Sequence, residues 1–245
     1  MRTLIKITRR AGLILGVKAL IAFIISWTRP RRALAETDYF SGTDYVGKTR
    51  AGPYEKFYIN YWKPLRRIHA ETWQLEVDGL CKNPQSFQLS TLLSLKARTQ
   101  ESRLKCVECW SAKAKWSGFH FSQLEQITNP LPEATGILFH CSDEYVEYLS
   151  LESLRHERTL FVHHMNGEPL SDEHGFPLRI IIPGKYGYKN PKAILRMEYV
   201  AETVSGTWSK IGPYSTDGTI LPGTDHPLEL GKRPHRIPGG EIISY

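Results

Sequence analysis

Cysteine is scarce in this sequence, with only four in 245 residues. So few cysteines exclude a small fold held together by a framework of disulfides. The Cys-x-x-Cys-His motif of covalent haem attachment and the cysteine runs of iron–sulfur proteins are also missing. We therefore expect no haem and no iron–sulfur cluster in this chain.

Acidic residues are absent from the first 35 positions, which carry eight Lys or Arg and no Asp or Glu. The whole chain has a formal charge of +7, but without this leader 24 basic residues face 25 acidic ones. The body of the protein is therefore close to neutral and gives no electrostatic case for binding DNA or RNA. We expect no nucleic-acid partner.

The leader combines a basic start with an apolar run. Arg9-Arg10 stands directly before residues 11–27, which are apolar except for Lys18, and Ala33-Leu34-Ala35 follows as a small-x-small cleavage pattern. Paired arginines in this position indicate twin-arginine export to the periplasm or extracytoplasmic face. The alternative is an uncleaved anchor, although a helix over 11–27 spans only about 26 Å of a ~30 Å hydrocarbon core.

The remaining chain divides by composition into three segments. We expect an irregular N-terminal arm over residues 36–71, a folded core over 72–204, and a Pro/Gly-rich C-terminal tail over 205–245 that packs on the core. Strand patterns cover residues 72–78, 84–89, 136–140, 145–149, 159–165, 178–182 and 193–200, and short helices are expected at 90–95, within 116–126 and at 151–154. This mixture predicts an α+β fold rich in β-structure.

Cys106-x-x-Cys109 is the most informative motif, and on its own it permits three chemistries. It could be half of a zinc site, a redox dithiol, or a single thiolate ligand to a soft, high-valent metal beside an ordinary buried cysteine. The sequence also contains a pair of adjacent histidines, His163-His164. This pair is not expected to hold an ion, because neighbouring residues on a strand point to opposite faces. We expect one of these two histidines to be buried and the other exposed.

The segment around Cys106 resembles the molybdenum-ligating loop of the sulfite oxidase superfamily. The match lies in Cys106-Val107-Glu108, Trp110-Ser111 and Trp116-x-Gly118-Phe119, and it continues in Trp73–Gly79, Phe139–Asp143, Met165–Leu170, His174–Arg179 and Pro183–Lys189. The most similar branch is the bacterial molybdopterin-binding branch that includes the catalytic subunit of the periplasmic methionine-sulfoxide reductase. The resemblance covers about residues 54–202 and implies a sulfite-oxidase-type fold.

The resemblance implies one mononuclear molybdenum held by a pterin dithiolene and by the thiolate of Cys106. Cys109 falls where this branch commonly has a small residue. Cationic residues that suit the pterin phosphate cluster around Pro183-Gly184, whereas a solvated basic loop is the alternative explanation for that cluster. By residue type or by position in the family, the candidate cofactor-binding residues are Tyr58, Cys141, His174, Arg179, Lys185, Lys189, Asn190, Pro191 and Lys192.

The implied activity is two-electron oxygen-atom transfer with a sulfur-containing substrate. A neutral sulfoxide is favoured over the sulfite dianion, because only Arg103 and Lys105 stand close before Cys106 and no Arg follows closely. Sulfite oxidation by a sulfite dehydrogenase is the alternative, and a non-catalytic, membrane-tethered module with the same fold is another. Because no second redox motif is visible, electrons require a separate partner, either a membrane haem subunit or a soluble cytochrome.

Overall fold

The computed structural model describes residues 39–40, 43–45, 58–107, 111–212, 214–220, 224–225 and 235–236. The chain divides into units of residues 1–38 and 39–245, and all described residues belong to the second. The export motif, the apolar run and the cleavage pattern of the leader lie outside the described residues. Within the described part, no helix has both the length and the apolar character needed to cross a membrane.

Short strands dominate the described part of the chain, with a few helices of one or two turns. The strands are β1 Tyr39–Phe40, β2 Thr43–Tyr45, β3 Tyr58–Asn60, β4 Leu65–Arg66, β5 Gln74–Gly79, β6 Gln85–Gln88, β7 Ala97–Lys105, β8 Ser111–Phe119, β9 Gly136–Cys141, β10 Val146–Ser150, β11 Leu160–Met165, β12 Glu168–Pro169, β13 Arg179–Ile181, β14 Ile194–Val200, β15 Thr224–Asp225 and β16 His235–Arg236. The helices are α2 Leu89–Leu93, α3 Ser122–Thr128, α4 Leu151–Arg155, η2 Gly187–Lys189 and α5 Thr207–Ile211.

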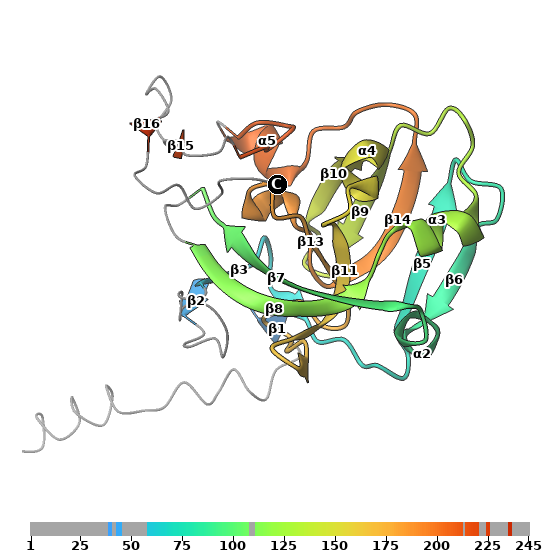
Figure 1. The fold of residues 1–245 in the computed structure, drawn as a ribbon, viewed down its shortest axis with the longest axis horizontal. Helices are drawn as coiled ribbons and strands as arrows, with labels where there is room; N and C mark the ends of the chain where they lie inside the picture. The colour runs from blue at the N-terminus through green and yellow to red at the C-terminus, as the bar shows by residue number, and fades with distance from the viewer. Residues whose placement is uncertain are drawn as a thin grey trace, which may run out of the picture. The chain divides into compact units, whose positions relative to one another are not determined.

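Two five-stranded sheets organise this part of the chain. The first has the order β10-β9-β14-β5-β6, in which only the β14–β5 pair is parallel. The second has the antiparallel order β12-β11-β8-β7, and β13 also pairs with β11. In Figure 1 the first sheet stands at the centre and right, and β7 and β8 sweep across the lower part of the picture.

The main core combines side chains from both sheets. Alternation in β5 buries Leu75 and Val77 and leaves their neighbours partly or fully exposed. These two residues join Phe139 of β9 with Phe119 and Phe161 of the second sheet in one buried cluster. A smaller cluster that includes Trp116 and Val162 covers the opposite face of the second sheet. Both faces of β8 and β11 are therefore buried.

The Trp-x-Gly-Phe motif has a packing explanation in this arrangement. Trp116 is fully buried and its indole N–H donates to the carbonyl of Ser102 across the β7–β8 pair (3.1 Å). A Cβ atom at Gly118 would lie 1.8 Å from the carbonyl oxygen of Phe161 on β11. Any side chain at position 118 would therefore push β8 and β11 apart.

The β7–β8 hairpin carries the cysteine motif to one end of the second sheet. The strands pair in unbroken register from Ala97 opposite Phe119 to Lys105 opposite Ser111. The connection between them is residues 106–110, of which 106 and 107 are described. Cys106 is thus the first residue after a long, regular strand, which fixes where its backbone leaves the sheet.

The alternation expected along β14 is wrong at one position. The sequence pattern places Leu195 on the same face as Met197 and Tyr199, both of which are buried, but Leu195 is 38% exposed and Ile194 is buried instead. The pairing of β14 with β9 shifts register between Ile194 and Arg196. Such an irregularity changes the face to which the next residue points, and hydrophobicity alone does not reveal it.

Candidate functional site

Cys106 lies beside the turn that follows β13. Its side chain is half-buried and packs against a cluster formed by Val107, Tyr186 and Ile220. Gly187 lies next to Cys106, because a Cβ atom built on Gly187 would be 3.9 Å from the Cα atom of Cys106. The fold therefore brings the cysteine next to the Pro183–Lys189 segment, which is about 80 residues away in the sequence.

Arg179 is a buried cation without a full set of partners. It begins β13, and its guanidinium carbon lies 5.3 Å from the ring centre of Trp116. One terminal nitrogen donates to the carbonyl of His174 (2.9 Å), but the buried Nε has no hydrogen-bond partner among the described residues. Burial lowers the pKa of Arg179 to about 10, so the side chain still carries its charge at neutral pH.

Lys192 is a second cation close to Arg179, and its side chain is half-buried. The two residues form an isolated antiparallel bridge between their backbones. The Lys192 ammonium donates to the carbonyl of Glu173 (2.8 Å) and lies 4.3 Å from the ring centre of Tyr61. Burial and the nearby Arg179 charge lower the pKa of Lys192 to about 7. Neither Arg179 nor Lys192 forms an ion pair with any carboxylate in the described part of the chain.

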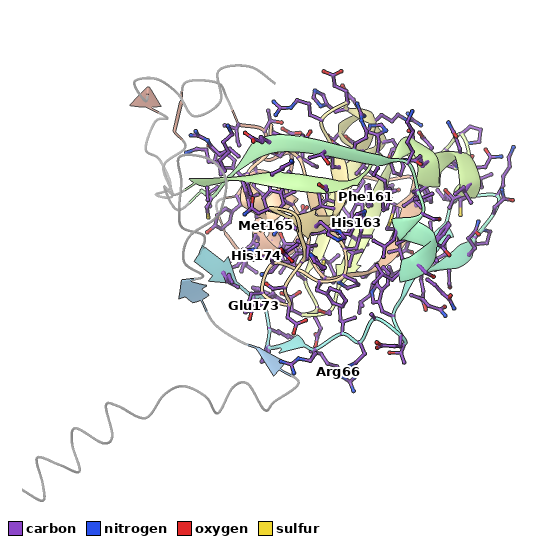
Figure 2. All side chains as sticks on the ribbon, turned by 60° about the horizontal axis from the view of Figure 1, so that its bottom comes forward. Arg66, Phe161, His163, Met165, Glu173 and His174 are labelled. Carbon is purple, nitrogen blue, oxygen red and sulfur yellow. The ribbon has the colours of Figure 1, made fainter. Side chains whose placement is uncertain are left out.

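His174 lies beside these two cations, and we call the group of His174, Arg179 and Lys192 the cationic cluster after its two charged members. Burial, Arg179 and Lys192 lower its pKa to about 3, so the imidazole is neutral at physiological pH. Gly175 has φ +99°, and a Cβ atom there would lie 2.4 Å from the Cβ of Lys192. Glycine therefore allows the loop between β12 and β13 to fold against Lys192. Figure 2 shows Glu173 and His174 below the long β7 and β8 strands in that view.

The cationic cluster is suited to a bound anion. A buried guanidinium that has a second cation beside it and no carboxylate within ion-pair distance is costly in the protein alone. An oxyanion would satisfy the unpartnered Nε of Arg179 and would offset both charges by charge-assisted hydrogen bonds. The phosphate end of a pterin cofactor is an anion of this kind, so the residues present fit such a group.

Lys185 and Lys189, also predicted to bind the cofactor, already have acidic partners. The Lys185 ammonium donates to a carboxylate oxygen of Asp217 (2.8 Å) and to the hydroxyl of Thr219 (3.1 Å). Lys189 is fully buried and forms an ion pair with the equally buried Glu147. These two lysines therefore stabilise the turn beside Cys106, and their direct contact with a cofactor stays a prediction.

Asn190 and Pro191 shape the same turn through their polar groups. The Asn190 side-chain oxygen accepts from the backbone N–H of Ile182 (2.6 Å), and its amide nitrogen donates to the carbonyl of Tyr186 (2.9 Å). The carbonyl of Pro191 accepts from the backbone N–H of Ile180 (2.9 Å). Both residues hold residues 182–191 in shape between Cys106 and the cationic cluster.

Cys141 lies at the end of β9, close to the cationic cluster. Burial, followed by the charge of Asp143, raises the pKa of this thiol well above its ordinary value. The backbone N–H of Lys192 approaches its sulfur and only partly offsets the shift. Cys141 is therefore protonated at neutral pH, as expected of a thiol buried in the wall of a site.

Two predicted features lie partly or wholly outside the described residues. The backbone of Tyr58 is in β3, where it pairs with Tyr45, but its side chain is outside what the structure describes. Residues 108–110, including Cys109, are also outside. The described residues bring together no group of three or more His, Cys, Asp and Glu side chains able to hold a metal ion.

The expectation for His163 and His164 is wrong. Both side chains are half-buried, and their Nδ1 atoms lie 2.5 Å apart. The register of β11 against β8 shifts between Val162 and His164, so two residues occupy the space of one. Val162 and Met165 consequently point to the same face, and the two histidines share the other.

Comparison with known proteins identifies the family. Residues 62–208 match the family described as "Oxidoreductase molybdopterin binding domain", which is more than half of the chain. The chain belongs to this family. The matched range contains Cys106, all three residues of the cationic cluster, and both five-stranded sheets.

Several members of the molybdopterin-binding family are similar over most of this chain. The protein-methionine-sulfoxide reductase catalytic subunit MsrP of Xanthomonas campestris is 28% identical over an alignment of 195 residues, and the match covers 72% of this chain and 61% of that protein. The putative protein-methionine-sulfoxide reductase subunit YedZ1 of Azospira oryzae is 31% identical over 164 residues (67% and 62%). MsrP of Campylobacter jejuni is 26% identical over 181 residues (66% and 61%). The chain thus spans about three fifths of the length of these relatives.

A solved structure supports the fold of the family. The sulfane dehydrogenase SoxCD from Paracoccus pantotrophus matches with a TM-score of 0.53 and 16% identity, over 73% of this chain and 54% of that chain. At this identity the likeness concerns the fold alone. The predicted α+β, sulfite-oxidase-type fold and the resemblance to the methionine-sulfoxide reductase branch are both confirmed.

Sequence reasoning missed three residues that shape the site. Tyr61 contributes the ring over Lys192, Glu147 holds Lys189, and Asp143 accepts from the backbone N–H of Trp62 (2.9 Å) and so attaches the N-terminal arm to the β9–β10 turn. Asp143 was part of a matched motif, so its importance was accessible from sequence. Glu147 carries no such signal, because it occupies an ordinary strand position.

Proposed function

We propose that this protein is an exported molybdopterin-dependent oxidoreductase that reduces a sulfoxide-type substrate. The observation that carries the proposal is that a half-buried Cys106 and a cationic cluster, in which Arg179 is buried and Lys192 half-buried, lie at the same turn, and that neither cation forms an ion pair among the described residues. A thiolate for the metal and cations for the phosphate are the two protein contributions that a mononuclear pterin cofactor requires.

Cys106 is the proposed metal ligand. Its position directly after β7 fixes its backbone, and Gly187 leaves room beside it. The bound cofactor would supply the two-electron chemistry by which oxygen moves between metal and substrate. The task of the chain is to present one thiolate and to leave the remaining metal positions open to substrate.

Arg179 and Lys192 are the proposed phosphate ligands, with neutral His174 beside them. Arg179 offers its unpartnered Nε–H, and Lys192 can turn its ammonium from the carbonyl of Glu173 towards an anion. The backbone bridge between Arg179 and Lys192 sets the spacing of the two cations before the cofactor arrives. Such preorganisation reduces the ordering cost of binding.

The proposed reaction is the reduction of a sulfoxide to a sulfide. The substrate takes up two electrons and two protons and releases one water molecule. The names of the MsrP relatives favour this direction. The electrons come from a separate one-electron carrier, which we propose to be a membrane haem subunit or a soluble cytochrome, on the extracytoplasmic side of the membrane.

Sulfite oxidation is the second candidate, and one observation favours it. Lys105 directly precedes Cys106 and is 3% exposed, and Arg103 is half-buried on the same strand. A buried cation next to the metal ligand would suit a dianionic substrate. A non-catalytic module with this fold is a third reading, which the absence of bound molybdenum would support.

Metal analysis followed by two assays separates these candidates. The protein, matured in a host that makes molybdopterin, is expected to contain about one molybdenum per chain, as the single thiolate ligand implies. It should then reduce a methyl sulfoxide with a viologen donor and leave sulfite unoxidised. Oxidation of sulfite would establish the second candidate, and protein without molybdenum would refute both enzymatic readings.

A further inference from the structure

A continuous row of aromatic rings leads from the neighbourhood of Cys106 to the surface helix α5. We call it the aromatic chain. Its members, from the outside inwards, are Trp62, Trp208, Tyr214, Tyr188 and Tyr186. They come from the N-terminal arm, from α5, from the segment after α5, and from the turn beside Cys106. Their contact is thus a product of the tertiary fold.

The outer steps of the aromatic chain are close edge-to-face contacts. The ring centres of Trp62 and Trp208 lie 5.5 Å apart with an interplanar angle of 78°. Those of Trp208 and Tyr214 lie 5.7 Å apart at 63°. Both distances are within the range of favourable aromatic pairs.

The inner steps continue without a gap to the proposed metal ligand. Tyr214 and Tyr188 have ring centres 5.5 Å apart, and Tyr188 stacks on Tyr186 at 6.3 Å with an angle of only 7°. Tyr186 belongs to the small cluster against which Cys106 packs. The last ring is therefore in the immediate surroundings of the thiolate.

Several contacts hold these rings in place. The Tyr188 hydroxyl donates to the carbonyl of Ser215 (2.7 Å), and Asp143 accepts from the backbone N–H of Trp62 (2.9 Å). A Cβ atom at Gly212 would lie 2.5 Å from the ring of Tyr214. Glycine at position 212 therefore keeps space for that ring.

The outer end of the aromatic chain is accessible. Trp62 and Trp208 are both half-buried, whereas the other described tryptophans, Trp73 and Trp116, are 5% and 0% exposed. Ile211, one turn after Trp208 on α5, is 59% exposed and is the most exposed large apolar side chain in the described part of the chain. A docking protein would find apolar contact and a conjugated ring at the same place.

We propose that the aromatic chain is the electron route between Cys106 and a haem-type carrier protein that docks at α5. This inference rests on the proposed function, because Cys106 must hold the redox centre. Electron tunnelling weakens steeply with distance, and conjugated rings in contact couple donor and acceptor better than saturated side chains or water. The rings serve as the medium and are themselves neither oxidised nor reduced during turnover.

The electron balance needs two carrier molecules for each substrate. In sulfoxide reduction, two ferrous haems each give up one electron and become ferric. The two electrons pass inwards, and the two protons come from water at the substrate. In the opposite direction, an enzyme reduced by two electrons converts two ferric haems to ferrous haems through the same route.

The first test uses the cofactor-free protein and measures the coupling of the rings directly. Azide radicals generated by pulse radiolysis take one electron and one proton from an accessible tryptophan. The tryptophan radical then recovers both from a tyrosine, which becomes a tyrosyl radical. We expect this transfer to be independent of protein concentration and several-fold slower in Tyr214→Phe and Tyr214→Leu. Tyr148→Phe, a buried tyrosine outside the aromatic chain, is the matched control.

The second test uses the molybdenum-loaded protein without substrate. The enzyme is reduced with dithionite, freed of excess reductant, and mixed rapidly with ferricytochrome c, whose reduction is followed by absorbance. Tyr214→Leu and Trp208→Leu should slow haem reduction several-fold. Tyr214→Phe should leave it nearly unchanged, because phenylalanine keeps the conjugated ring although it cannot be oxidised like tyrosine.

The contrast between phenylalanine and leucine separates an electron route from mere packing. If Tyr214 only packed against its neighbours, Tyr214→Phe would change the rate of radical transfer and the rate of haem reduction to the same extent. The proposal is overturned if Tyr214→Leu leaves both rates at the wild-type value, or if it changes them no more than Tyr148→Phe does. A protein without molybdenum would refute the proposed function instead, and the radiolysis test would still report on the rings.

Discussion

Arg179 is a charged side chain that protein contacts leave incompletely satisfied. Its guanidinium stacks near Trp116 and donates to one carbonyl, yet its buried Nε–H has no acceptor among the described residues. A structural arginine at this depth would be expected to have a carboxylate partner. The missing acceptor is therefore the feature of Arg179 that argues for a bound oxyanion.

Replacing Arg179 by alanine should lower cofactor occupancy. A lost hydrogen bond to a charged group costs roughly 1.5–3 kcal/mol, about ten- to a hundredfold in affinity. The measurement is molybdenum and pterin content of protein matured with limiting cofactor. Arg196→Ala is the matched control, because Arg196 is paired with Asp78 and Glu198 on the other sheet. Equal molybdenum content in both variants would remove Arg179 from the site.

Lys192 should make the stability of the cofactor-free protein depend on pH. In the folded protein it loses its proton at about pH 7, whereas an exposed lysine of the unfolded chain keeps it to about pH 10. Within this window the unfolded state binds more protons, so the free energy of unfolding contributed by Lys192 rises with pH. Urea unfolding across the window should show a rise that is smaller in Lys192→Met. Identical slopes for the two proteins would contradict a Lys192 that titrates near pH 7 in the folded state.

Cys106, Cys109 and Cys141 should differ sharply when replaced one at a time. Cys106→Ser should abolish turnover while the pterin still binds, because a hard oxygen donor changes the electronics of the metal and the phosphate contacts lie elsewhere. Cys109→Ala should be nearly neutral, and Cys141→Thr should keep molybdenum. Metal content and turnover of the three variants are the measurements. If Cys109→Ala is as inactive as Cys106→Ser and both lack molybdenum, a two-cysteine site is the better description.

The residue types of the site were predictable from sequence, but which of the cations form ion pairs within the protein was not. The cationic residues from His174 to Lys192 were recognised as one group. The fold divides them, because Glu147 and Asp217 form ion pairs with Lys189 and Lys185, whereas no carboxylate in the described part of the chain pairs with Arg179 or Lys192. Those two carboxylates are distant along the chain, and no local pattern links them to the lysines they meet.

At the level of elements, the sequence predicted buried strands well and missed the one that presents Cys106. Alternation predicted β5, and the sequence also predicted β9 and the apolar strand β11; the apolar residues of all three face the core. β7 is polar along most of its length, so it has no hydrophobic strand pattern and was not predicted as a strand. Its backbone pairing with β8 holds it in the sheet instead. The irregular positions in β11 and β14 were also missed, since they arise from pairing between strands.

The ion pair between Glu147 and Lys189 joins β10 to η2 and should make a large contribution to stability. Both side chains are essentially unexposed, and Lys189 also donates to the carbonyls of Tyr148 and Thr216 (both 2.7 Å). Lys189→Met should cost about 3–5 kcal/mol, because it leaves a buried carboxylate without its partner. Urea unfolding measures the change.

A double variant provides the control for this ion pair. Adding Glu147→Gln to Lys189→Met removes the orphaned charge and should recover part of the lost stability. Tyr145, whose hydroxyl donates to Glu147 (2.9 Å), still has an amide oxygen to bond in that variant. A double variant less stable than Lys189→Met would show that the unpaired carboxylate of Glu147 is not what destabilises the single variant.

At the scale of the whole molecule, we propose that the leader directs export of the protein. Replacing Arg9 and Arg10 together by Lys should leave folded, cofactor-loaded protein in the cytoplasm, because the proposed twin-arginine route depends on the paired arginines. Cell fractionation with molybdenum analysis measures this. An N-terminus at Glu36 on the exported wild-type protein would establish cleavage, and normal export of the variant would exclude the twin-arginine route.

The backbone bridge between Arg179 and Lys192 has a consequence for how the protein matures. Pairing these two segments forces two like charges together, so folding without the cofactor works against their repulsion. A bound anion attracts both cations and so offsets their repulsion. Like any ligand that binds only the folded state, it also stabilises that state. Empty and loaded chains would then differ in how readily this region opens. A transport system that accepts only well-folded proteins would then favour the loaded chain. It would distinguish the two forms by their resistance to local unfolding and would need no contact with the cofactor.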